Sequence, residues 1–225
     1  DSFIFLYRHG TRYPGKKTIS KYFRLTDLAE SLKTNKLLSD EERRAFEKWK
    51  PLEIKLDHQK YLTKEGEEEL FELGKRFRNQ FPHFFGSDNT SFSFKHTPTQ
   101  RTNVSARKFI EGLFPHDAEK YQPLEVARDD PILRPYKGCQ LWRTSVKKNP
   151  ESLKEKRALI QSQHMENLIN EMREMLRFDF LDFKDIELIY TMCGFETAWR
   201  HSLLNGKSTW CSLFRNENLL YCGCG

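Results

Sequence analysis

Apolar residues near the start of the chain form one uninterrupted run of strand length. The run is FIFLY at positions 3–7, and Arg8, His9 and Gly10 follow it directly. Continuous rather than alternating hydrophobicity is typical of a strand covered on both faces, as in a parallel sheet. The pattern therefore predicts a buried strand at residues 2–7, with a polar loop at its carboxyl end.

Helical periodicity dominates the rest of the chain. A charged amphipathic stretch at 19–49 predicts helices outside the sheet, and Thr63 is the expected cap of a helix that continues past Phe77. Another helix is expected after Pro98, and a long one at about 150–177 whose methionines we interpret as core residues.

Short strand-like segments lie between these helices, at 92–94 and at 185–190, although the second could also extend a helix. Strands alternating with helices predict an α/β fold, a largely parallel sheet flanked by helices with an inserted helical subdomain. The expected α/β core comprises residues 1–18, 59–136 and 185–225, and the helical insertions comprise 19–58 and 137–184.

The charge balance favours anionic partners without selecting one. Lysine and arginine outnumber aspartate and glutamate by 38 to 32, a net charge of +6. A solvated surface of mixed sign is the preferred explanation of the charge taken alone. The longest basic clusters are pairs, so nucleic acid is not expected, and no apolar run reaches membrane-spanning length.

The cysteines favour disulfides in the secretory pathway over a metal site, because none has zinc-finger spacing. An odd count leaves a free thiol or a missing partner, and reduced cysteines in a cytosolic protein are the alternative. Asn89 begins a glycosylation sequon, and no signal peptide stands before the first strand. The cysteines are Cys139, Cys193, Cys211, Cys222 and Cys224.

The candidate chemistry lies in residues 8–14, RHGTRYP, directly after the first predicted strand. Open α/β sheets bind ligands just beyond the carboxyl ends of their strands. A neutral imidazole can attack phosphorus, and flanking guanidiniums bind phosphate oxygens through forked hydrogen bonds. Their positive charge lowers the pKa of the imidazole, which keeps it nucleophilic in mild acid. His9 is therefore the predicted nucleophile, with Arg8 and Arg12 as phosphate ligands.

Four segments in the same order resemble the histidine acid phosphatases, a branch of the histidine phosphatases that includes phytases. RHGTRYP matches their nucleophile motif, and LTKEG at 62–66 resembles a segment that opens a core helix. TPTQRT at 97–102 resembles the segment that supplies a third phosphate-binding arginine. CGFE from Cys193 and WCSLF around Cys211 resemble paired cysteine segments, so the resemblance extends to about Phe214.

The resemblance implies a phosphoglycerate-mutase-like α/β fold and hydrolysis of phosphomonoesters through a phosphohistidine, without cofactor or metal. The TRYP version of the motif indicates the inositol polyphosphate branch, with phytate-like small anionic substrates; a general acid phosphatase is the nearest alternative. Arg101 becomes the third phosphate ligand, near a helix N-terminus that favours anions, although alone it would read as a surface arginine. His96 is a candidate to support the residues that bind phosphate without contacting the substrate itself.

One part of the family pattern is absent from these residues. Family members complete the site with a later His-Asp or, in the inositol polyphosphate branch, His-Ala-Glu, whose acid protonates the leaving alcohol. The only similar spelling, HDAE at 116–119, lies far too early, and we expect no role for it. The sequence thus predicts a chain truncated at its C-terminus and poorly active alone; a non-catalytic phosphate-binding fragment or pseudoenzyme is the alternative.

Other motifs for phosphate chemistry fit less well. Gly206, Lys207 and Ser208 spell the end of a P-loop, but His201 stands where the first glycine is required. Cys193 lies one position too far from Arg200 for the loop of cysteine phosphatases. The remaining histidines show no metal-ligand spacing, so no metal is expected.

Overall fold

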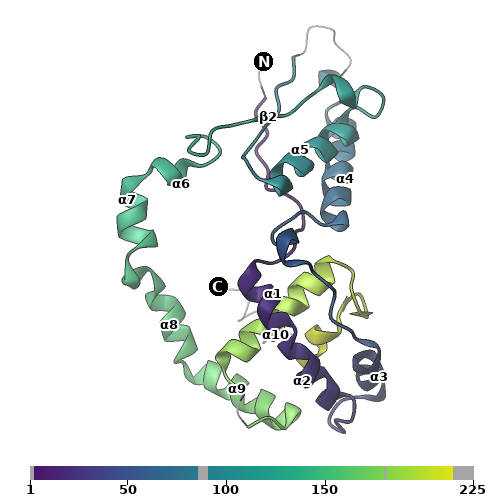
Figure 1. Ribbon diagram of the computed structural model, residues 1–225, viewed down its shortest axis with the longest axis vertical. Helices are drawn as coiled ribbons and strands as arrows, with labels where there is room; N and C mark the ends of the chain where they lie inside the picture. Colours follow the sequence, from purple (N-terminus) through teal and green to yellow (C-terminus); the bar gives the residue numbers. More distant parts are fainter. Residues whose placement is uncertain (1–2, 86–90, 180, 215–225) are drawn as a thin grey trace. The chain divides into compact units, whose positions relative to one another are not determined.

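The computed structural model describes residues 3–85, 91–179 and 181–214, and helices dominate it (Figure 1). The chain divides into two compact units. The first comprises Asp1–Tyr13 and Lys60–Ser145, and the second comprises Pro14–Gln59 and Val146–Gly225. The division into an α/β core and helical insertions stays a prediction.

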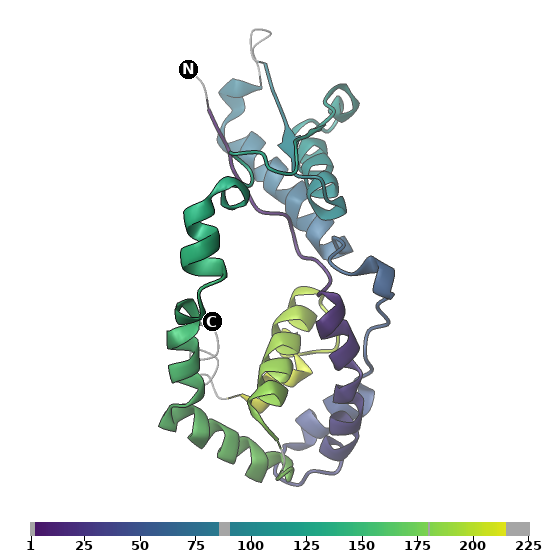
Figure 2. The ribbon, with the colours of Figure 1, turned by 60° about the vertical axis from the view of Figure 1, so that its left-hand side comes forward.

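Two long helices form the centre of the first unit. Helix α4 (Lys64–Gln80) begins at Thr63, whose hydroxyl accepts a hydrogen bond from Gly66 N, and α5 (Gln100–Leu113) lies beside it (Figure 1; Figure 2). Their backbones touch at two glycines: a Cβ on Gly74 would lie 2.3 Å from Phe109 O, and one on Gly112 would lie 2.1 Å from Phe71 O. Only glycine permits this approach.

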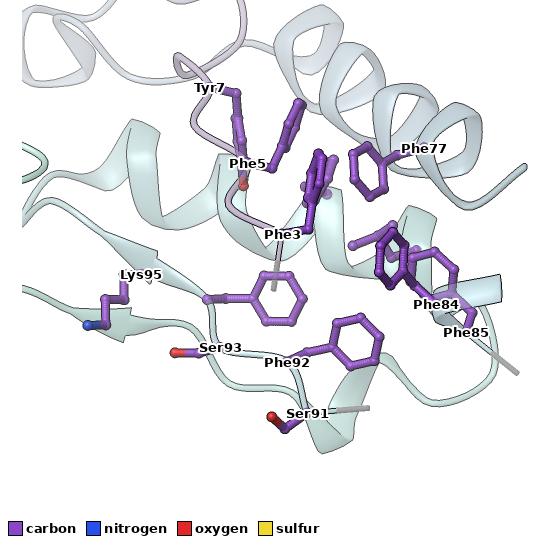
Figure 3. Close-up of a pocket in the computed structure, with 13 residues that line it drawn as sticks. Phe3, Phe5, Tyr7, Phe77, Phe84, Phe85, Ser91, Phe92, Ser93 and Lys95 are labelled. Carbon is purple, nitrogen blue, oxygen red and sulfur yellow. The ribbon is translucent and has the colours of Figure 1, made fainter. Parts of the chain in front are cut away.

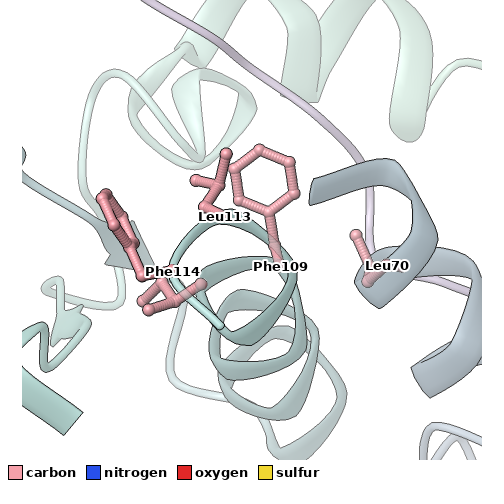
Figure 4. Close-up of a cluster of buried hydrophobic side chains, with 5 residues drawn as sticks. Leu70, Phe109, Leu113 and Phe114 are labelled. Carbon is pink, nitrogen blue, oxygen red and sulfur yellow. The ribbon is translucent and has the colours of Figure 1, made fainter. Parts of the chain in front are cut away.

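The hydrophobic core of the first unit lies along this helix pair (Figure 4). Most of its buried residues come from the last two turns of α5 and the residue after it, and one comes from α4. Burial of each large side chain contributes about 1.5–3 kcal/mol to folding. The cluster comprises Leu70, Phe109, Ile110, Leu113 and Phe114.

The strands are much shorter than the pattern predicts. In the first unit β1 (Lys95–His96) pairs in parallel with β2 (Leu124–Glu125). A parallel pair within a helix-rich chain agrees with the predicted α/β class, but the strand expected at 92–94 begins only at Lys95. Short elements complete this unit: η2 (Pro82–Phe84), η3 (Ala118–Lys120), α6 (Pro135–Gly138) and α7 (Gln140–Trp142). The next element, η4 (Arg143–Lys147), begins in this unit and ends in the second.

The buried strand predicted at residues 2–7 is wrong for this structure. Residues 3–10 form no strand with any part of the described chain. Ile4 and Leu6, on one side of the segment, are 90% and 69% exposed. The aromatic residues that alternate with them contact Phe77 or Phe109. A strand requires ladder hydrogen bonds from a neighbour, whereas here helices cover one side only.

The second unit is almost entirely helical. Helices α1 (Lys16–Tyr22), α2 (Arg24–Leu32) and α3 (Asp40–Lys48) form its first part. Of the later helices, α10 (Phe183–Ala198) includes residues 185–190, so the strand considered there is wrong. Asp182 caps α10 by accepting hydrogen bonds from Lys184 N and Asp185 N, which favours the helix.

The single helix expected at 150–177 is divided into three. These are η5 (Pro150–Leu153), α8 (Lys154–Ile160) and α9 (Gln163–Leu176). The break before α9 follows from Ser162, whose hydroxyl accepts a hydrogen bond from Met165 N and so begins a new helix. The remaining elements are η1 (Leu56–His58), the antiparallel pair β3 (Leu203–Leu204) and β4 (Lys207–Ser208), and η6 (Thr209–Leu213).

A fully buried carboxylate lies at the centre of the second unit. Glu196 accepts hydrogen bonds from Tyr22 OH at 2.5 Å, Trp49 Nε1 at 3.0 Å and Ser208 Oγ at 2.7 Å. Burial raises the pKa of Glu196, against the lowering effect of these hydrogen bonds. The three donors come from separate parts of the unit, so this carboxylate connects them.

One disulfide, Cys193–Cys211, joins α10 to η6, which confirms part of the cysteine prediction. Cys139 is an exposed free thiol, and Cys222 and Cys224 lie outside the described residues, as does the sequon at Asn89. Among the described helices, none is long and apolar enough to span a bilayer.

Candidate active site

The backbone of the RHGTRYP loop rests directly on both long helices of the first unit. Gly10 N donates a hydrogen bond to the buried Ser105 Oγ on α5, at 3.2 Å. A Cβ on Gly10 would lie 2.3 Å from Gly66 O on α4, so no larger residue fits without displacing the loop. The contacts of Gly10 with α4 and α5 therefore fix the position of the backbone next to His9.

The next residue, Thr11, both donates and accepts hydrogen bonds that hold the loop against α4. Its N–H and hydroxyl donate to the two carboxylate oxygens of Glu69, at 2.8 and 2.6 Å. Its carbonyl oxygen accepts a hydrogen bond from Thr63 N at 3.0 Å, and Arg12 forms an isolated antiparallel bridge with Leu62. The LTKEG segment thus positions the loop as well as opening α4.

Glu69 and Ser105 are site-supporting residues that the sequence reading missed. Glu69 follows Gly66 by three residues, so both face the same side of α4, and this spacing was an available signal. Ser105 carried no such signal, because its contact with Gly10 spans 95 positions of the chain.

The geometry of His9 defines its tautomer. Its Nδ1 lies 2.8 Å from the carbonyl oxygen of Gly10, which can only accept, so Nδ1 carries the proton and Nε2 keeps its lone pair. Burial lowers the pKa of His9, and the charges of Arg101, Arg8 and Arg12 lower it further, whereas the bond to Gly10 opposes them. The lowered pKa favours the neutral imidazole, in which Nε2 is unprotonated.

The three arginines act on His9 and on one another. Burial lowers the pKa of Arg12 most, and the charges of Arg101 and Arg8 lower it further. Arg12 also donates a hydrogen bond to Tyr13 O at 2.8 Å. Within the described residues neither Arg8 nor Arg101 forms an ion pair, and the Nε of Arg101 is buried without a hydrogen-bond acceptor. Positive charges that influence one another in this way make a site suited to an anion.

Arg101 lies in the first turn of α5, where free amides and the helix dipole also favour negative charge. Threonines fix the approach to this turn: Thr102 Oγ1 donates to Thr97 O at 2.6 Å and lies 2.7 Å from Thr99 Oγ1. The first turn contains no acidic residue that would compete for Arg101.

His96 lies just before this turn and is 4% exposed. Its Nδ1 donates to Thr97 O at 2.8 Å, and its Nε2 accepts from Asn103 Nδ2 at 3.1 Å. Both ring nitrogens thus help to hold the segment that carries Arg101. A supporting role at the site stays a prediction for His96.

The alternatives weighed from the sequence have different outcomes. Cys193 is disulfide-bonded, which excludes a thiolate nucleophile, and the Lys207 and Ser208 of the P-loop spelling form β4. Asp117 of the HDAE segment is exposed and pairs with Lys120. Within the described residues no three His, Cys, Asp or Glu side chains are grouped to hold a metal ion.

A separate pocket of about 400 Å³, lined largely by aromatic side chains, lies in the same unit (Figure 3). Phenylalanine side chains form most of its wall, including Phe5, Phe77 and Phe92, and among the described residues that line it Lys95 is the one with a charge. None of the candidate site residues lines it, so it is distinct from the arginine cluster.

Comparisons with known proteins show the family of the chain. The family model described as histidine phosphatase superfamily (branch 2) matches residues 1–223. Multiple inositol polyphosphate phosphatase 1 of Drosophila melanogaster is 31% identical over 227 residues, which cover 95% of this chain and 47% of that protein. The Homo sapiens protein of the same name is 26% identical over 231 residues, 94% of this chain and 46% of its own length.

Two solved phytases have a similar fold. The D. castellii phytase superposes with a TM-score of 0.70 at 16% identity, covering 96% of this chain and 47% of its own. The Klebsiella sp. ASR1 phytase gives a TM-score of 0.50 at 13% identity. The match covers 96% of this chain and 55% of the phytase chain. The fold is thus the helix-rich α/β fold of these phosphatases, and the chain spans about half the length of its curated relatives.

Proposed function

Because the chain belongs to the histidine phosphatase superfamily, branch 2, we propose that it carries the nucleophile half of a phosphomonoesterase acting on inositol polyphosphates. The observation that supports this most directly is the geometry of His9. Its Nδ1–H is bonded to Gly10 O, and the charges of three arginines lower the pKa of the ring, which favours an unprotonated Nε2.

In the proposed reaction, Nε2 of His9 attacks the phosphorus of a phosphomonoester in line with the ester oxygen. Arg8, Arg12 and Arg101 bind the non-bridging oxygens and neutralise their charge, as preorganised donors do in other phosphoryl transfers. The P–O bond breaks, the leaving oxygen takes a proton from solvent water or from the acid that the family resemblance implies, and phosphohistidine remains. Water then cleaves the P–N bond, which releases phosphate and regenerates the imidazole.

The substrate class rests on the relatives and on charge. Both curated relatives are named for multiple inositol polyphosphate phosphatase, and both solved neighbours are phytases. The net charge of +6 is compatible with a highly anionic substrate. A general acid phosphatase is the alternative, and comparing kcat/KM for inositol hexakisphosphate and for glycerol phosphate separates the two.

The cellular setting is part of the proposal. A disulfide between Cys193 and Cys211 persists in oxidising compartments, which supports the secretory pathway. Glycosylation at Asn89 belongs to the same proposal, and mass spectrometry of the secreted chain tests it.

The central experiment traps the intermediate. Labelled nitrophenyl phosphate is mixed with the 225-residue chain and quenched in alkali, where phosphohistidine survives. We expect label on the wild type and on the control His116→Ala, whose histidine is exposed, and none on His9→Ala. Label on His9→Ala would overturn the mechanism. Phosphate binding without label on the wild type would favour the phosphate-binding pseudoenzyme.

A further inference from the structure

The peptide unit between Gly10 and Thr11 is hydrogen-bonded at both of its ends. At one end the Gly10 carbonyl oxygen accepts from His9 Nδ1 at 2.8 Å, and at the other end Thr11 N donates to Glu69 Oε2 at 2.8 Å. The unit is trans, so its C=O and N–H point in opposite directions. Two hydrogen bonds in series therefore join the carboxylate on α4 to the imidazole of His9.

Glu69 holds its end of this series through two contacts. Its other oxygen, Oε1, accepts from the Thr11 hydroxyl at 2.6 Å, a length typical of a bond to an ionised acceptor. Thr11 thus directs both of its donors at one carboxylate. Helix α4, which carries Glu69, also touches the loop at Gly66, so the carboxylate has a fixed place relative to the peptide.

The carboxylate affects the carbonyl group at the far end of the peptide. Hydrogen bonds in series polarise one another, so an anion at the N–H makes the Gly10 oxygen a better acceptor. The same bond opposes a rotation of the peptide plane that would take this oxygen away from Nδ1. The hydrogen bond at one nitrogen of a histidine decides which nitrogen carries the proton. The bond at Nδ1 therefore keeps the lone pair of His9 on Nε2.

We propose that Glu69 is a positioning residue for His9, because through the Gly10–Thr11 peptide it fixes the tautomer and the orientation of the ring that attacks phosphorus. This inference rests on the proposed function and adds to it a group that contacts neither the substrate nor the imidazole. Phosphate binding depends mainly on positive charge, which acts over several ångströms, whereas in-line attack depends steeply on alignment. Loss of Glu69 should therefore lower the rate more than the affinity.

Two measurements on the 225-residue chain test this role. NMR of isotopically labelled histidine nitrogens shows which nitrogen of His9 carries the proton, and rapid quenching with labelled nitrophenyl phosphate gives the rate of phosphohistidine formation. In Glu69→Ala we expect a population protonated at Nε2 to appear and the rate to fall about tenfold or more. The affinity for inorganic phosphate, followed by titration, should change less than about threefold.

Three further variants separate the route through the peptide from other effects. Glu72→Ala is the matched control and should behave as the wild type, because Glu72 is an exposed glutamate on the same helix that pairs with Lys75. Thr11→Val removes only the hydroxyl bond and should slow phosphorylation less than Glu69→Ala does. Glu69→Gln keeps an oxygen that can accept from Thr11 N, so it should recover part of the rate.

Several outcomes would overturn the inference. An unchanged tautomer and rate in Glu69→Ala would do so and would leave the proposed function intact. An equal fall in rate and in phosphate affinity would mean that Glu69 only holds the loop in place. A loss in Thr11→Val as large as in Glu69→Ala would mean that the hydroxyl, not the peptide, carries the effect.

The two measurements also separate this inference from the proposed function. If the wild type takes no label, the proposed function fails, and the tautomer, which needs no turnover, still decides whether Glu69 orients His9. If circular dichroism shows that Glu69→Ala is unfolded, Glu69→Gln decides, and a tautomer and rate equal to those of the wild type would count against the role.

Discussion

A Cβ atom on Gly66 would lie 2.1 Å from the carbonyl oxygen of Thr11, so helix α4 and the loop that carries His9 meet backbone to backbone. Thr63 N donates to the same carbonyl oxygen. Any side chain at position 66 must push the loop away from α4. The position of the nucleophile therefore depends on a residue that contacts no ligand.

Substituting Gly66→Ala is expected to displace this loop. Overpacking at such a contact costs about 1–3 kcal/mol of folding free energy, and phosphate affinity should fall with it. Urea unfolding and phosphate titration measure the two effects. Gly194→Ala is the control, because nothing lies within 4 Å of a Cβ there, and replacing a helical glycine should slightly stabilise the fold. Equal phosphate affinity in Gly66→Ala and wild type would contradict the coupling.

Removing the charge of Arg101 should raise the pKa of His9. Arg101 is the first of the three arginine charges that lower it, so Arg101→Gln moves the midpoint of the imidazole titration to higher pH. Nε2 of the variant therefore becomes protonated at a higher pH than in the wild type. NMR titration of the His9 ring follows this directly. Arg107→Gln, an exposed arginine on the same helix, should leave the midpoint in place.

The buried Glu196 should make the second unit more stable in acid than at neutral pH. Its native pKa is raised above the unfolded value, so its stabilisation is complete below the unfolded pKa and is lost as pH rises through the native pKa. Glu196→Gln removes this titration and should flatten the pH dependence of unfolding. Glu187→Gln, an exposed neighbour on α10, should not. Identical pH profiles for Glu196→Gln and wild type would exclude this role.

Truncating Glu196 to alanine is a separate test of the same network. It leaves the donors of Tyr22, Trp49 and Ser208 without their acceptor in the core. Unsatisfied buried donors cost about 1–3 kcal/mol each, so we expect a loss of several kcal/mol in urea unfolding. A loss below about 1 kcal/mol would show that the network contributes little.

Loss of the disulfide should destabilise the same unit. Cys193 and Cys211 are 18 positions apart, and a closed loop of this size is worth about 3 kcal/mol. Replacing both by serine should therefore lower Tm, and a reductant should have the same effect on the wild type. Cys139→Ser controls for the loss of a thiol, since Cys139 is free and exposed.

On ordinary substrates the 225 residues alone should be poor catalysts. We predict that the proton donor implied by the family resemblance is not among them, and a positioned acid supplies about two to four powers of ten in rate. Arginine cannot replace it, because its guanidinium keeps its proton. Nitrophenolate leaves without a proton, so nitrophenyl phosphate should be hydrolysed much faster than an alkyl phosphate. Comparable rates would indicate an acid within the chain, and Asp117 and Glu119 would be tested first.

The nucleophile loop could be predicted because its chemistry is contained in adjacent residues. Arg8, His9 and Arg12 are neighbours in sequence, and the resemblance supplied Arg101 from a segment with its own motif. Helices with strong caps were also predictable, since capping acts over a few residues, as with Thr63 on α4. The interruption of the 150–177 helix at Ser162 was equally local in origin but was outweighed by the apolar stripe around it.

The sequence by itself thus determined the family, the helical character of the chain and the residues proposed to perform the chemistry. Only the tertiary structure decided that residues 3–7 pack on one side only, and that Glu69 and Ser105 hold the loop. The physical reason is range: motifs and caps act between near neighbours, whereas the Thr11–Glu69 and Gly10–Ser105 contacts join residues 58 and 95 positions apart.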